Sequence, residues 1–118
     1  MKDFKKIREV LSGTQGALAI LSAPSLMIAL EVINILLRSS DQIHLVGILP
    51  EQGDQTTVLM AGEVGFIRHA TNALKQESGN EIGQVTHAII MRPHEQLLDW
   101  IERAITMKPL PGKNQGRV

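Results

Sequence analysis

The chain has 118 residues, of which 43% are hydrophobic and 20% charged, as expected for one ordinary globular domain. Its 12 basic and 12 acidic residues cancel, so no general affinity for nucleic acid or anionic lipid is expected. It has no cysteine, which excludes disulfides, thiolate catalysis, zinc–thiolate sites and cysteine-ligated iron–sulfur clusters, and fits a cytoplasmic location.

The first third of the chain alternates helical and extended patterns. Apolar residues at helical spacing over Asp3–Leu11 predict an N-terminal helical extension at residues 1–13. A short buried strand is expected at Gly16–Leu21, and Ser25 is one of two serines suited to cap the next helix. That helix, Leu26 to about Arg38, is apolar almost all round and should be largely covered. It is too short to span a bilayer.

The middle of the chain reads as a hairpin followed by a helix. The strands Ile43–Leu49 and Thr56–Ala61 flank a polar turn in which Gly53 can adopt a positive φ. The helix Glu63–Ser78 then places its apolar residues on one face.

The last third predicts a strand, a helix and a tail. The strand is Val85–Met91, and Pro93 stops it. A terminal helix is expected over Glu95–Met107, and the proline- and glycine-rich residues 108–118 should be a flexible tail. The central domain is therefore expected at residues 16–94.

The predicted order of the central elements is β-α-β-β-α-β, with one added helix at each terminus. This order is typical of the α+β, ferredoxin-like fold. It predicts one antiparallel sheet with both central helices on one face. The other face must be covered, either by the terminal helices or by neighbouring subunits.

Four segments resemble the bacterial microcompartment shell domain in its unpermuted, single-domain form. They span about two thirds of the chain and are Gly16–Leu21, Leu37–Gly47, Val58–Thr71 and Ile89–His94. The resemblance implies a structural protein and not an enzyme, with cyclic hexamers that tile edge to edge into the shell. It extends weakly to variant tiles of glycyl-radical compartments, but without cysteine no iron–sulfur cofactor is expected.

The resemblance also implies roles for particular residues. The loop between the second and third strands would line a central pore for small metabolites, and it consists of Pro50, Glu51, Gln52, Gly53, Asp54 and Gln55. The residues that would contact the adjoining tile are Arg38, Arg92 and His94. Other shell proteins would bind edge to edge, and enzymes inside the compartment are further candidate partners.

The pore loop departs from the family pattern, because it has two acids and no base. Six-fold symmetry would place six copies of Glu51 and Asp54 around one axis. Two carboxylates about 5 Å apart repel by roughly 3 kcal/mol at an effective dielectric constant near 20. The pore should therefore favour cations or neutral molecules over anions.

Plainer interpretations stand beside these. The loop can be an ordinary polar turn, and the two arginines can be solvated side chains. The four histidines are scattered without metal-ligand spacing, and His94 can cap the terminal helix. Phe4 and Trp100 are expected to cover apolar surface, on their own subunit or on a neighbour.

Two other functions remain open at this point. The same topology serves trimeric metabolite-binding modules, which oligomer size would distinguish from a hexameric tile. A small enzyme would need a nucleophile, base or metal motif, and no such motif is present. RNA binding is disfavoured by an aromatic content of 3% and by the absence of net charge.

Overall fold

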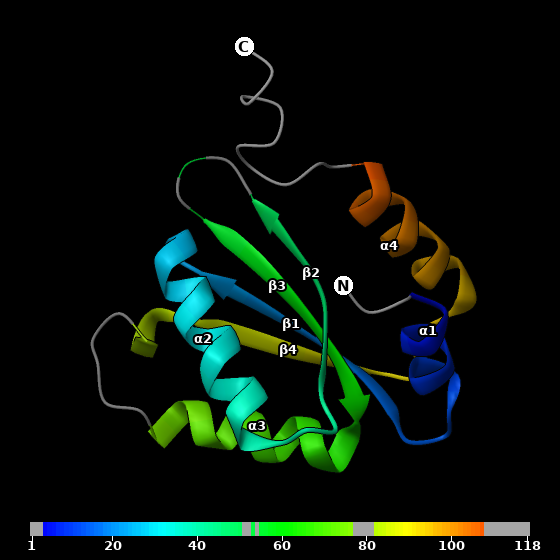
Figure 1. Ribbon diagram of the computed structural model, residues 1–118, viewed down its shortest axis with the longest axis horizontal. Coiled ribbons are helices and arrows are strands. Elements are labelled where there is room, and N and C mark those ends of the chain that lie inside the picture. Colours follow the sequence, from blue (N-terminus) through cyan, green and yellow to red (C-terminus); the bar gives the residue numbers. More distant parts are fainter. Residues whose placement is uncertain (1–3, 51–52, 54, 77–81, 108–118) are drawn as a thin grey trace.

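A computed structural model describes residues 4–50, 53, 55–76 and 82–107 (Figure 1). Its elements, in chain order, are α1 (Phe4–Ser12), β1 (Gly16–Ala23), α2 (Leu26–Ser39), β2 (His44–Pro50), β3 (Thr56–Glu63), α3 (Val64–Gln76), the 3-10 helix η1 (Ile82–Gln84), β4 (Thr86–Met91) and α4 (Glu95–Met107). The predicted tail and the predicted pore residues Glu51, Gln52 and Asp54 lie outside the described residues.

The four strands form one antiparallel sheet in the order β2-β3-β1-β4. This order and the succession of elements confirm the predicted α+β fold. β3 continues two residues beyond the predicted strand, so that Glu63 pairs with Gly16 at one end of the sheet. The 3-10 helix before β4 was not predicted.

One face of the sheet packs against α2 and α3. Its core combines alternate residues of β1, such as Ala19 and Leu21, with the buried face of α2 around Val32 and that of α3 around Ile67. The strand residues alternate between the two faces because successive side chains point to opposite sides of a sheet. Ser25 caps α2 as predicted, since its Oγ accepts a hydrogen bond of 3.2 Å from the amide of Ile28.

The terminal helices α1 and α4 pack on the opposite face of the same sheet. Ile7 and Leu11 of α1 join Leu98 and Ile101 of α4 in a second buried cluster over β1, β2 and β3. The two helices also lie beside each other in Figure 1. The terminal helices of the chain therefore cover much of the second face of the sheet. The sequence had left open whether these helices or neighbouring subunits cover it.

Arg8 of α1 links the two terminal helices through ion pairs with α4. Its guanidinium lies 2.7 Å from Asp99, 3.3 Å from Glu102 and 3.7 Å from Glu95, all on α4. It also lies 5.7 Å from the centre of the Phe4 ring. The hydrogen bond to Asp99 is the largest cause of a raised pKa for Arg8.

Two glycines allow the terminal helices to approach the sheet. A Cβ on Gly16 would lie 2.5 Å from the carbonyl oxygens of both Val10 and Leu11, so α1 can end against the start of β1 only if this residue is glycine. A Cβ on Gly47 would lie 2.9 Å from the side chain of Ile105, at a register shift in β2 where α4 docks.

One prediction about coverage is wrong in the single chain. α2 was expected to be largely covered, but Met27 is 71% exposed and Leu30 is 52% exposed. A helix lying on a sheet buries only one side, and nothing in the described chain covers the opposite side of α2. Phe4 packs against the second core as expected. Trp100 is 55% exposed in the single chain, so a contact between this side chain and a neighbouring subunit stays a prediction.

Candidate functional site

The predicted pore loop and the predicted edge residues lie at opposite ends of the sheet. Pro50 pairs with Thr56 beside the hairpin turn, whereas Gly16 pairs with Glu63 at the far end of β3. The seven residue steps along β3 span roughly 23 Å at about 3.3 Å per residue. A ring centred on the hairpin would therefore carry the far ends of the strands at its rim.

Three loop residues are described. Gly53 has the positive φ, 71°, that the sequence predicted for this turn. The side chain of Gln55 accepts a hydrogen bond of 2.9 Å from the Ser22 hydroxyl, which ties the hairpin to the end of β1. Pro50 and Gln55 are both exposed. The assignment of the loop to a pore stays a prediction.

The predicted edge residues Arg38 and Arg92 are both exposed, and both lie at the far end of the sheet. Arg38 lies in the last turn of α2, where a positive charge also favours the helix dipole. Arg92 follows β4, and its amide donates a hydrogen bond of 2.9 Å to the carbonyl of Gly16. Its φ is 46°, the left-handed conformation that side chains other than glycine rarely adopt.

His94 has the capping role that was weighed as its plainer interpretation. Its Nδ1 accepts a hydrogen bond of 3.0 Å from the amide of Gln96 at the start of α4. The ring is exposed, so capping leaves its other side accessible. A contact between His94 and an adjoining tile stays a prediction.

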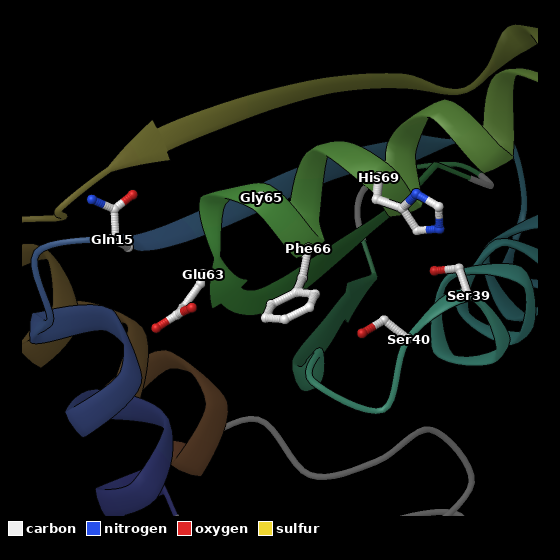
Figure 2. A pocket seen from close by; sticks show the side chains of 7 residues that line it. All are labelled: Gln15, Ser39, Ser40, Glu63, Gly65, Phe66 and His69. Carbon is white, nitrogen blue, oxygen red and sulfur yellow. The ribbon is translucent and has the colours of Figure 1, made fainter.

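A hollow of about 620 Å³ lies at the same end of the molecule as the two arginines. Its lining comes from three separate segments, as Figure 2 shows, and consists of Gln15, Ser39, Ser40, Glu63, Gly65, Phe66 and His69. Glu63, Phe66 and His69 are spaced three residues apart, so they share one side of the start of α3. Ser39 directly follows Arg38 in the sequence. Gln15 directly precedes Gly16, whose carbonyl accepts the hydrogen bond from the Arg92 amide.

A second, apolar hollow lies on the exposed side of α2. It is lined by Leu26, Met27, Leu30, Glu31 and Asn34. Leu37 continues the same stripe one to two turns further along the helix and is also exposed. We call Leu26, Met27, Leu30 and Leu37 the α2 stripe. Four large apolar side chains in one exposed row are typical of a contact surface.

The described residues contain no group of three His, Asp or Glu side chains that could hold a metal ion. Within the same residues, no helix is both long and apolar enough to cross a membrane.

Comparison with solved structures shows what the fold is similar to. A crystal structure of a microcompartment protein from Desulfitobacterium hafniense DCB superimposes with a TM-score of 0.62 and 21% sequence identity. The match covers 81% of this chain and 50% of that chain, so this chain spans about half the length of the protein it matches. The fold is that of a microcompartment protein. No family model and no curated protein matches the sequence.

Another solved structure, the divalent ion tolerance protein CutA1 from Ehrlichia chaffeensis, has a TM-score of 0.48. It is 14% identical and is matched over 80% of this chain and 98% of its own. A likeness at that level carries no argument about this chain.

Sequence reasoning missed the hollow at the end of α2 and the exposure of the α2 stripe. Phe66 offered one indication, because it falls off the apolar face formed by Val64, Ile67, Thr71 and Leu74 and joins the polar face of α3. The hollow itself depends on three segments that meet only in the folded chain. No spacing in the sequence connects Gln15 with Ser39 or His69.

Proposed function

We propose that this chain is a structural shell protein of a bacterial microcompartment. Six copies would form a ring, with the hairpin loop around a central pore for small molecules and with the arginine-bearing ends at the rim. Rings would then tile edge to edge with each other and with other shell proteins. The likeness to a solved microcompartment protein is the observation that carries this proposal.

The placement of the hairpin and the two arginines at opposite ends of the sheet supports the proposed ring. Pro50 and Gln55 flank the hairpin at one end of the strands, while Arg38 and Arg92 lie at the other. A single subunit therefore has one end suited to an axis and one suited to a perimeter. Residues Glu51 and Asp54, which would give the pore its acidic character, belong to the undescribed part of the loop.

The α2 stripe supports association between copies. An isolated subunit would leave Met27 and Leu30 in water, at a cost of about 25 cal/mol for each Å² of apolar surface exposed. In a cyclic ring every subunit repeats the same contact with its neighbour, so one such surface is used six times. The stripe fits a lateral contact because it runs along the length of α2.

The first experiment is the solution mass of the purified chain, measured by light scattering during size-exclusion chromatography. The subunit mass is 13.0 kDa, and the proposal expects a particle of six subunits. A monomer or a trimer would contradict the ring, and a trimer would return attention to the metabolite-binding module.

A variant with a matched control tests the stripe. Leu30→Glu should lower the solution mass, because it places a charge in an apolar contact. Gln96→Glu is the control, since it adds the same charge at an exposed position on α4. Equal masses for the Leu30→Glu variant and the parent would remove the stripe from the ring contact.

A further inference from the structure

The start of α4 has an imidazole as its cap. The Nδ1 atom of His94 accepts a hydrogen bond of 3.0 Å from the amide of Gln96. The next two amides, those of Leu97 and Leu98, donate to the backbone carbonyl of the same histidine at 2.9 Å and 3.1 Å. The first amides of a helix have no partner in a preceding turn. His94 therefore provides the acceptors for three consecutive amides of α4.

The side-chain part of this cap requires one protonation state of the imidazole. A neutral imidazole has one nitrogen that donates and one that accepts, so acceptance at Nδ1 places the proton on Nε2. An imidazolium donates from both nitrogens and accepts at neither. A proton on Nδ1 therefore removes the hydrogen bond from Gln96 and turns two donors toward each other. It also places a positive charge at the N-terminal end of a helix, which the helix dipole disfavours.

The charged groups around His94 do not offset this loss. Glu95, the next residue of α4, would attract an imidazolium, but its side chain is 74% exposed and it already lies 3.7 Å from Arg8 of α1. Arg92, which follows β4, would repel it. Exposed ion pairs contribute little in water, whereas an N-cap contributes more.

The remainder of α4 is held by contacts that do not involve the cap. Arg8 donates a hydrogen bond of 2.7 Å to Asp99, one turn beyond the first. Ile101 is 3% exposed in the second core, and Ile105 lies against Gly47 of β2. Loss of the cap should therefore open the first turn of α4 and leave the later turns on the sheet.

We propose that His94 is a pH-sensitive cap, which closes the first turn of α4 when the imidazole is neutral and releases it when the imidazole is charged. Imidazole is the side chain that changes its charge between about pH 5 and 8. The hydrogen bond stabilises the helix start at the upper end of this range and is lost as the pH falls. The cap lies within one subunit, so it does not depend on the proposed ring.

Amide hydrogen exchange of the full chain, followed by NMR, tests the cap. Protection factors, which correct for the intrinsic effect of pH on exchange, are compared at about pH 7.5 and about pH 5.5. The protection of Gln96 should fall about fivefold on acidification, the ratio that corresponds to the loss of an ordinary N-cap. The amides of residues 102–105 should keep their protection and serve as the internal reference. Equal protection of Gln96 at both pH values would overturn the proposal.

Variants assign the effect to His94. His94→Asn should be protected equally at both pH values, because asparagine caps a helix without titrating. His94→Ala should show the lower protection at both. His87→Asn is the matched control, since His87 is an exposed histidine on β4, and it should keep the pH dependence of the parent. A fall of the same size in His94→Asn and in the parent would show that another group is responsible.

The nitrogen-15 chemical shifts of the His94 imidazole give a measurement that does not depend on stability. At about pH 7.5, Nδ1 should have the shift of an unprotonated ring nitrogen and Nε2 that of a protonated one. A proton on Nδ1 at this pH would refute the cap. The mass of the ring tests the proposed function separately.

Discussion

At the scale of single residues, Arg92 combines an unfavourable backbone with an exposed charge. Its φ of 46° is costly for any residue with a Cβ, by roughly 1–2 kcal/mol. The hydrogen bond from its amide to Gly16 holds this conformation at the point where β4 ends and Pro93 follows. Folding alone would be served as well by glycine. Under the proposed function, the guanidinium would instead contact an adjoining tile.

Two substitutions at this position separate the backbone from the side chain. Arg92→Gly should melt at or above the temperature of Arg92→Ala, because glycine removes the strain that alanine keeps, even though it adds freedom to the unfolded chain. Differential scanning calorimetry measures the order, and the reverse order would show that the left-handed backbone is not maintained. Both variants should fail to form sheets if the guanidinium is an edge contact.

At the scale of elements, the terminal helices form a unit. α1 and α4 are far apart in the sequence, but they share the second core and the contacts of Arg8 with three carboxylates. Exposed ion pairs contribute little singly, and a network held by one guanidinium contributes more. We expect this network to govern how often α4 leaves the sheet.

Arg8→Gln should therefore speed hydrogen exchange at the backbone amides of α4 and lower the melting temperature. Both effects should shrink in high salt, because ions screen the parent network. Lys6→Gln is the matched control, since Lys6 is an exposed base on the same helix. Equal exchange in the Arg8→Gln variant and the parent would mean that apolar packing alone holds α4.

At the scale of the whole molecule, the sheet separates two kinds of surface. The hairpin lies at one end, and the two arginines and the hollow lined by Glu63 and Ser39 lie at the other. The α2 stripe runs along the helix whose last turn holds Arg38. Under the proposed function, the stripe serves the contacts within a ring and the arginine end serves the contacts between rings.

Arg38→Asp tests this separation. The variant should keep the mass of the parent ring but form fewer sheets in negative-stain electron microscopy, because the donor fork at the edge is replaced by an acid. A small loss of stability is also expected, about 0.3–1 kcal/mol, since an acid at a helix C-terminus opposes the dipole. Arg103→Asp on α4 is the control for the change of charge, and normal sheets from Arg38→Asp would remove this residue from the edge.

The sequence by itself determined the elements and their order. Alternating strand patterns and helical spacing are local properties of the chain, so the sheet, both central helices and both terminal helices were predictable, and so was the positive φ of Gly53. Only the tertiary structure determined which segments pack against one another and which side chains stay exposed. It placed α4 against Gly47, exposed Met27 on a helix that looked covered, and brought Gln15, Ser39 and His69 to one hollow. Such contacts depend on the docking of segments distant in sequence, and the spacing of residues within one segment does not contain that information.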